Sequence, residues 1–328
     1  MPDTFINEFV SGSRRALAKL ISAVENDGAP ARAILDELYA KVGRAYRIGI
    51  TGPPGAGKST LVDQLAKTIR ASGRTVGIIA VDPTSPFTGG ALLGDRVRMH
   101  DLTTDAGVFI RSMATRGSLG GLSQKAQDAA DVLDIFGKDF IIFETVGVGQ
   151  SELDIVEAAD TVVVILVPES GDSVQAMKAG LMEIADIFVL NKSDRDGAPR
   201  AVQELEAILH LRPAAAWNPP VVPTVASIAK GIIEVWEKIQ SHREFLAQDG
   251  RLVAKRKHRL EKKIHELVSR RLKHEFWDEE AQRVLNMSLE NFQNQKLSPY
   301  RIVEELMGKF MPQAIGETRD SKGEHEVF

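Results

Sequence analysis

Residues 52–59 carry the most specific chemical pattern in the sequence. They read Gly-Pro-Pro-Gly-Ala-Gly-Lys-Ser, which matches GxxxxGK[ST], and lie between an apolar run ending at Thr51 and a helix-like pattern from Leu61. Glycines in this order let backbone N–H groups wrap a phosphate while a helix N-terminus faces the anion. Lys58 would neutralise β- and γ-phosphate oxygens, and the Ser59 hydroxyl would bind Mg²⁺. The segment predicts a nucleoside triphosphate site.

A second polar segment indicates the base. Asn191-Lys192-Ser193-Asp194 follows an apolar run at 187–190. The Asp194 carboxylate can accept hydrogen bonds from guanine N1–H and the exocyclic amine, and Lys192 would lie along the base plane. Adenine offers no such donor pair, so a buried carboxylate would be left unpaired. Such a tetrapeptide alone is often a solvated turn, but its order after the phosphate loop predicts GTP and GDP.

Three acidic residues are candidates for the metal and the switch segments. Glu144 ends an apolar run and is followed by Gly147, the arrangement in which related loops sense Mg²⁺ and the γ-phosphate. Asp82 and Asp95 bracket a Gly/Pro/Thr-rich loop, which is either such a switch or a plain surface loop. Val148 stands where a water-orienting Gln is common, and we therefore expect slow intrinsic hydrolysis.

Taken together, the expected Mg²⁺ ligands are Ser59, Asp82, Asp95 and Glu144, with Lys58 beside them in catalysis. The expected nucleotide contacts are Gly52, Pro53, Pro54, Gly55, Ala56, Gly57, Lys58, Ser59, Thr60, Gly147, Asn191, Lys192, Asp194 and Ser227.

The elements that must position these residues are β-rich runs separated by helical patterns. Strands are expected at Ile48–Thr51, Val76–Asp82, Val108–Arg111, Phe140–Glu144, Val162–Val167, Ile187–Asn191 and Val221–Ser227. They are apolar throughout, as in strands buried on both faces of a parallel sheet. We expect an α/β, doubly wound, mostly parallel P-loop sheet.

Four regions follow along the chain. Residues 1–44 are expected to be an N-terminal helical extension, 45–231 the P-loop domain, 232–310 a C-terminal helical arm, and 311–328 a disordered tail. Apolar residues at helical spacing from Leu260 to Phe276 predict a long helix, and Ser298-Pro299 predicts the start of a last one.

The composition excludes several functional classes of protein. The 328 residues include no cysteine, which removes disulfides and thiolate metal sites, and the net charge of −4 does not suggest a polyanion binder. The seven histidines form no metal-ligand spacing. Neither a bilayer-spanning run nor a signal or transit peptide is apparent, so we expect a soluble, cytoplasmic protein without membrane partners.

Residues 242–275 are basic, with eleven Lys or Arg and five Asp or Glu. The acidic residues are interleaved and no aromatic series accompanies them, which disfavours nucleic acid. We interpret the segment as a solvated face on a helical dimerisation arm.

Several longer strings resemble one family. VDPTSPFTGGALLGDR (81–96), ETVGVGQSE (144–152), QAMKAGLMEIAD (175–186) and NKSD (191–194) closely resemble the methylmalonyl-CoA mutase-associated GTPases of the MeaB/ArgK/MMAA type. RRALAKLISAVEN (14–26) is similar to that family's N-terminal helix, and the resemblance runs from about residue 10 to about 310.

The resemblance implies a homodimeric GTPase chaperone of an adenosylcobalamin-dependent acyl-CoA mutase. It would gate cofactor loading and removal of inactivated cobalamin, with hydrolysis stimulated by the mutase, and a cobalamin adenosyltransferase is a further implied partner. Matching by motif, Asp82 and Asp95 fall in switch I, Glu144 and Gly147 in switch II. Lys178 falls in a third, partner-responsive switch with a catalytic or coupling role.

Alternatives remain open. A GTP-dependent phosphotransferase linked to amino-acid transport needs an acceptor pocket that the sequence does not reveal. A nickel-type metallochaperone GTPase would want His or Cys ligands. A signal-recognition-type targeting GTPase would want a Met-rich partner domain, which eight scattered Met do not supply.

Overall fold

The computed structural model describes residues 3–26, 28–82, 100–114, 124–145, 151–168, 180–213, 215–290 and 298–310. These residues belong to two compact units, Met1–Arg259 and Leu260–Phe328, which are considered separately. The four-region division expected from the sequence stays a prediction.

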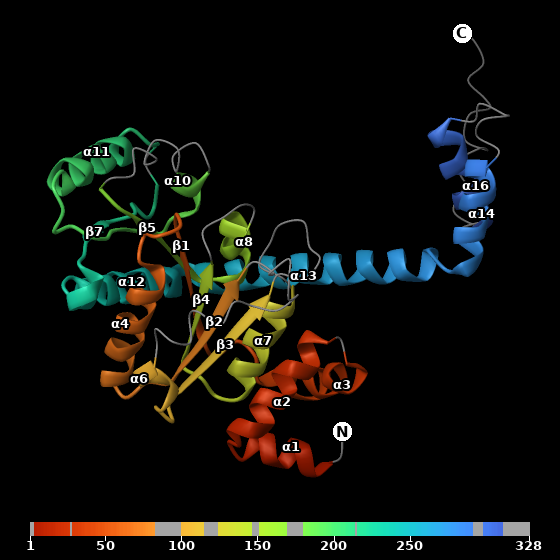
Figure 1. Ribbon diagram of the computed structural model, residues 1–328, viewed down its shortest axis with the longest axis horizontal. Coiled ribbons are helices and arrows are strands. Elements are labelled where there is room, and N and C mark those ends of the chain that lie inside the picture. Colours follow the sequence, from red (N-terminus) through yellow and green to blue (C-terminus); the bar gives the residue numbers. More distant parts are fainter. Residues whose placement is uncertain are drawn as a thin grey trace, which may run out of the picture. The chain divides into compact units, whose positions relative to one another are not determined.

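A parallel sheet of seven strands forms the centre of the first unit (Figure 1). The strands are β1 (Tyr46–Thr51), β2 (Val76–Asp82), β3 (Val108–Ala114), β4 (Phe140–Thr145), β5 (Thr161–Leu166), β6 (Ile187–Leu190) and β7 (Val221–Pro223). Their order is β3-β2-β4-β1-β5-β6-β7, and every pair is parallel. The doubly wound α/β fold expected from the sequence is confirmed.

Side chains of each central strand enter two hydrophobic cores, one on each face of the sheet. In β4, for example, Phe140 and Ile142 belong to one core and Ile141 and Phe143 to the other. Because both faces are covered, the strands read as continuous apolar runs rather than as alternating ones.

Helices from distant parts of the sequence cover the two faces. The core with Phe140 is closed by α4 (Lys58–Ala71), α6 (His100–Thr103) and α12 (Ile232–Ala247), and α12 packs beside α4. The core with Ile141 is closed by α2 (Arg14–Glu25), α7 (Gln124–Ile135), α8 (Ser151–Ala158), α10 (Leu181–Ile184) and α11 (Ala198–His210).

The N-terminal helices are part of this second core. They are α1 (Asp3–Val10), α2 and α3 (Ala29–Leu38), and α2 packs beside α7 (Figure 1). Ser13 caps α2 by accepting a hydrogen bond from the Ala16 N–H, and Leu17 and Leu20 are fully buried. Arg111 of β3 pairs with Glu25 at the other end of α2. Both ends of α2 are therefore fixed.

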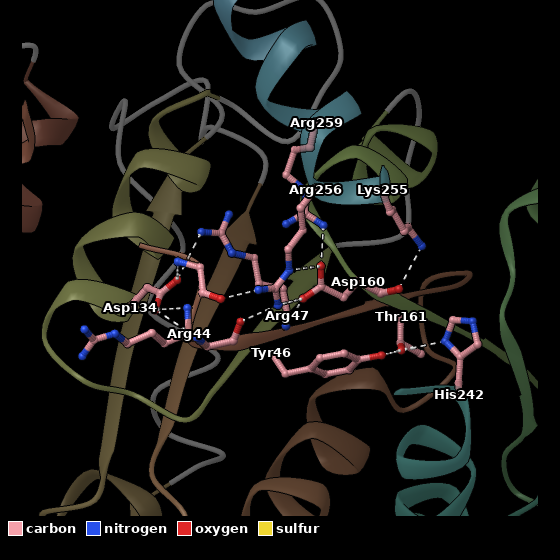
Figure 2. A network of polar contacts seen from close by, with 12 residues as sticks. Arg44, Tyr46, Arg47, Asp134, Asp160, Thr161, His242, Lys255, Arg256 and Arg259 are labelled. Carbon is pink, nitrogen blue, oxygen red and sulfur yellow. Dashed lines mark hydrogen bonds and ion pairs between the residues drawn. The ribbon is translucent and has the colours of Figure 1, made fainter. Parts of the chain in front are cut away.

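A buried carboxylate at the amino-terminal edge of the sheet holds the first turns of α13 (Arg251–Phe276), as Figure 2 shows. Asp160 is fully buried and accepts hydrogen bonds from the Arg47 N–H, the Arg256 guanidinium and the Arg259 guanidinium, at 2.8–3.0 Å. Burial raises the pKa of this carboxyl, but Arg259 and Arg256 outweigh burial and hold the pKa at about 2. Asp160 thus remains ionised, as a paired buried charge must be.

A chain of buried hydrogen bonds continues from the next residue (Figure 2). The Thr161 hydroxyl lies 2.6 Å from the Tyr46 hydroxyl and 2.8 Å from His242 Nδ1. His242 is 2% exposed, and burial lowers the pKa of its imidazole although Asp186 acts in the opposite direction. The histidine is accordingly neutral in the fold at neutral pH.

The second unit contains the rest of α13 from Leu260, α14 (Glu279–Glu290) and α16 (Pro299–Phe310). Asp278 accepts a hydrogen bond from the Ala281 N–H and so begins α14, while Ser298 caps α16 as expected. Val284, Ile302 and Leu306 form a small core between these two helices. Among the described residues, no helix has the length and apolar character needed to cross a bilayer.

Candidate functional site

The predicted nucleotide residues gather at the carboxyl-terminal edge of the sheet. The phosphate loop follows β1, Glu144 lies at the end of β4, and Asn191 follows β6. β1 lies between β4 and β5, where the order of strands along the sheet changes direction. Ligands of open α/β sheets bind outside the strand ends at such a point.

Two glycines of the phosphate loop lie where no side chain fits. Gly52 has φ +141°, and a Cβ there would lie 2.1 Å from the Ile165 carbonyl oxygen. Gly57 has φ +91°, and its Cβ would lie 2.4 Å from Asn191 Nδ2. Both combine a backbone conformation that favours glycine with a close approach of a neighbour. The loop is therefore pressed against β5 and the segment after β6.

Lys58, the first residue of α4, extends back over the loop. Its Nζ donates hydrogen bonds to the carbonyl oxygens of Gly52, at 2.8 Å, and Pro53, at 3.0 Å, and the residue is 7% exposed. An ammonium group is thus held within the curve of the loop, at the N-terminus of a fourteen-residue helix. A helix N-terminus and a fixed cation together favour an anion.

Ser59 and Glu144 bring a hydroxyl and a carboxylate together beside Lys58. Ser59 Oγ donates a hydrogen bond to Glu144 Oε1 at 2.6 Å, and Glu144 is 4% exposed. Next to them, Thr145 Oγ1 donates to Thr51 Oγ1 at 2.9 Å, which ties the ends of β4 and β1 together. Oxygen ligands of this kind suit Mg²⁺.

Asn191 joins the predicted base-reading segment to the phosphate loop. Its Nδ2 donates to the Ala56 carbonyl oxygen at 2.8 Å, and the residue is 3% exposed. Lys192 adds a second link, because its Nζ donates to the Gly55 carbonyl oxygen at 2.8 Å. Lys192 has φ +57°, a left-handed conformation that is rare for residues with a side chain and is often found at functional sites. Asp194 is exposed.

The other side of Asn191 reveals residues that sequence reasoning missed. Asn191 Oδ1 accepts hydrogen bonds from the Ala226 N–H at 3.0 Å and from Thr224 Oγ1 at 3.1 Å, and Thr224 is fully buried. These contacts bring the short helix η2 (Ala226–Ile228), which contains the exposed Ser227, to the same place. A lone Thr after a strand gives no signal by which sequence reasoning could have found this role.

The remaining predicted residues are placed only in part. Pro54, Gly55 and Thr60 are exposed on the loop and the first turn of α4, whereas Ala56 is buried. Asp82 ends β2, and its side chain lies outside the described part of the structure. Asp95, Gly147 and Lys178 lie outside the described residues altogether. Within the described ranges, no group of His, Asp or Glu side chains forms a multi-ligand metal site.

Comparison with known proteins identifies the family of this chain. The family model described as "Methylmalonyl Co-A mutase-associated GTPase MeaB" matches residues 17–281. A predicted GTPase of Pyrococcus horikoshii is 50% identical over 317 residues, covering 94% of this chain and 99% of the relative. The GTPase ArgK of Escherichia coli is 36% identical over 307 residues, covering 90% of this chain and 92% of ArgK.

A solved structure described as a LAO/AO transport system kinase is similar over 94% of this chain and 99% of its own, with a TM-score of 0.71 and 29% identity. A mouse relative, the mitochondrial methylmalonic aciduria type A homolog, is 36% identical over 273 residues, which are 77% of this chain and 66% of the relative. The family match spans most of the chain, and the relatives from Pyrococcus horikoshii and Escherichia coli are GTPases by description. The chain belongs to the family of methylmalonyl-CoA mutase-associated GTPases.

Proposed function

We propose that this GTPase acts as the chaperone of an adenosylcobalamin-dependent acyl-CoA mutase. GTP hydrolysis is the activity of the family to which the chain belongs, and the chaperone role is what we propose in addition. In this role the protein gates loading of the cofactor and removal of inactivated cobalamin. The family description, which names methylmalonyl-CoA mutase, and the similarity to the mouse methylmalonic aciduria homolog support this role.

The structural observation that supports GTP as the nucleotide in this role is the bond between Asn191 and Ala56. It holds the segment that we propose to read guanine, residues 191–194, against the phosphate loop. Asp194 would then accept the guanine N–H groups while Lys58 and the loop amides bind the phosphates. An adenine nucleotide would leave Asp194 without its donors.

The donor set beside the phosphate loop fits Mg²⁺. Ser59 and Glu144 already share a hydrogen bond, and Asp82 and Asp95 are further candidate ligands. Bound there with GTP, the ion would neutralise the charge on the β- and γ-phosphates. Ser59 and Glu144 would orient the ion from α4 and β4, two elements fixed in the core.

Slow intrinsic hydrolysis of GTP is consistent with a regulatory role for this GTPase. The residue after Gly147 is Val148, so the sequence supplies no water-orienting Gln at that position. A site of this kind holds GTP until a partner completes it, and the mutase is the proposed partner. Lys178, in the QAMKAG string, is the residue we propose to respond to that partner.

We further propose that the protein is a homodimer. In the second unit, one face of α13 exposes an apolar stripe, with each side chain 40–50% accessible: Leu260, Ile264, Leu267, Val268 and Leu272. The spacing places them on one helical face. A second copy would cover this stripe, which is larger than isolated surface apolar residues explain. Sedimentation velocity should give a dimer, and Val268→Glu should give a monomer, whereas Ile233→Glu on α12 should leave the dimer intact.

Phosphoryl transfer to an acceptor is the second candidate, favoured by the description of the similar solved structure as a transport system kinase. The fate of the γ-phosphate separates the two functions. A GTPase releases the γ-phosphate as inorganic phosphate when GTP is the only substrate. A kinase requires an acceptor and transfers the γ-phosphate to it, so that radiolabelled γ-phosphate appears on the acceptor.

The experiment that tests the chaperone role follows adenosylcobalamin transfer into the apo-mutase by absorbance, with this protein and either GTP or GDP. Loading should depend on which nucleotide is bound, and Lys58→Ala should abolish that dependence. Loading at one rate with GTP, with GDP and without the protein would contradict the proposal while leaving GTP hydrolysis intact.

A further inference from the structure

A cavity of about 940 Å³ lies at the amino-terminal edge of the sheet, away from the nucleotide residues. It is enclosed by α10, the end of α11, the segment that follows α11 and the start of β7. Asp186 immediately precedes β6 and Val221 begins β7, which places the cavity where these two strands start. No contact described for the nucleotide site involves its lining residues.

One wall of the cavity is a fixed aromatic surface. Trp217 Nε1 donates a hydrogen bond to the Asp186 carbonyl oxygen at 2.8 Å. The indole also packs against His242, with ring centroids 4.7 Å apart, and against Phe245, at 5.2 Å. Because hydrogen bond and packing both hold the ring, a ligand would not have to order it on binding.

Acidic side chains outnumber basic ones in the rest of the lining, which is otherwise mainly apolar. Glu183, Asp186 and Glu206 contribute carboxylates, and Glu183 and Glu206 are exposed. Asp186 is shared with Lys255, at 3.6 Å, and His242, at 3.4 Å. Among the described contacts, neither Glu183 nor Glu206 has an ion pair. Two carboxylates that line the same cavity as an indole form a combination that attracts a cation by charge and by cation–π interaction.

Two basic side chains of the lining form hydrogen bonds with backbone carbonyl groups. The Arg212 guanidinium donates to the Met182 carbonyl oxygen, and His210 Nδ1 lies 2.7 Å from the Glu206 carbonyl oxygen. A free basic amino acid carries a carboxylate, which the three acidic side chains of the lining would repel. A Lys or Arg side chain within a polypeptide brings a positive charge without that carboxylate.

We propose that this cavity docks an arginine- or lysine-bearing segment of a protein partner. The cationic side chain lies over Trp217 and pairs with Glu183 and Glu206, and the backbone of the segment crosses the open side of the cavity. The proposal does not depend on the chaperone role, because its geometry is separate from the nucleotide site. Because Glu183 belongs to α10, the docked segment contacts this helix directly.

The test uses the full chain and a fluorescently labelled, acetylated and amidated Gly-Arg-Gly-Arg-Gly peptide, followed by anisotropy up to about 1 mM. The same peptide with Glu in place of both Arg is the charge-reversed probe, and free arginine is the small-molecule probe, measured by competition. The Arg peptide should bind, binding should weaken as salt rises, and neither other probe should bind comparably.

Glu183→Gln combined with Glu206→Gln should weaken binding of the Arg peptide about tenfold. Glu204→Gln is the matched control, since Glu204 lies on the same helix but pairs with Arg200 outside the cavity. GTP affinity should be unchanged in all variants, which shows that they fold. No binding of the Arg peptide, equal binding of the Glu peptide or free arginine, or equal weakening by Glu204→Gln would overturn the proposal.

Discussion

Asn191 Nδ2 lies 2.8 Å from the Ala56 carbonyl oxygen, so one buried amide joins the predicted base-reading segment to the phosphate loop. The same side chain accepts from Ala226 and Thr224. Two loops separated by well over a hundred residues of sequence thus share one hydrogen-bonding centre. These bonds set the distance between the predicted base-reading segment and the phosphate loop.

Asn191→Ala should therefore lower GTP affinity, because the two loops lose the side chain that joins them. Losing these hydrogen bonds costs about 2–3 kcal/mol, or roughly a hundredfold in the dissociation constant. Equilibrium binding of a fluorescent GTP analogue measures this. Asn286→Ala, at an exposed position on α14, is the control and should bind normally. Wild-type affinity in Asn191→Ala would mean that the two loops are positioned by other contacts.

Gly57→Ala should weaken GTP binding about tenfold or more, because the added Cβ would displace Asn191 and strain a φ of +91°. Gly73→Ala is the control that measures the effect of backbone strain alone, without a close approach of a neighbouring atom. Gly73 has φ +77° with no atom within 4 Å of its Cβ, so that variant should lose about 1 kcal/mol of stability and no nucleotide affinity. Equal affinities in the two variants would refute the close approach at Gly57.

Asp160→Asn should destabilise the first unit by about 3–5 kcal/mol, because Arg256 and Arg259 would keep their charges and lose their partner. Urea unfolding measures the change. Glu204→Gln breaks an exposed pair and should cost under about 0.5 kcal/mol. Similar costs in both variants would show that Asp160 is not the anchor of α13.

The stability of the fold should fall as pH decreases below about 6.5, in part through His242. The buried imidazole has a lowered pKa in the fold, so the unfolded chain takes up its proton first. The contribution of His242 to the free energy of unfolding is therefore complete at pH values above the pKa of this histidine in the unfolded chain. Below that pKa, the contribution declines by up to about 1.4 kcal/mol per pH unit. Urea unfolding from pH 7.5 to about 5 gives the free energy of unfolding of the wild type and of His242→Asn. The difference between the two proteins at each pH measures the contribution of His242. A difference that does not change with pH would contradict it.

Much of the fold could be predicted from the sequence because it depends on local pattern. All seven strands were expected from apolar runs, and the strand boundaries differ most at β3, which extends beyond Arg111 to Ala114, and at β7. That strand was expected to reach Ser227 but ends at Pro223. Pro223 has no N–H to donate, and Val225 pairs with Lys230 instead. The helix α14 was not predicted.

The long-range contacts could not be predicted in this way. The basic segment 242–275 was interpreted as a solvated face, yet Arg256 and Arg259 point inward to Asp160. An Arg pattern on a helix does not reveal a carboxylate almost a hundred residues earlier. The site motifs predicted chemistry for Lys58, Ser59 and Asn191, while the supporting role of Thr224 appears only in three dimensions.

GTP turnover by the purified protein, alone and with an adenosylcobalamin-dependent acyl-CoA mutase, tests the central claim most directly. Inorganic phosphate release should be slow for the protein alone, absent in Lys58→Ala and in EDTA, and several times faster with the mutase. An unchanged rate at saturating mutase would contradict the chaperone role, and turnover that persists in Lys58→Ala would contradict the site itself.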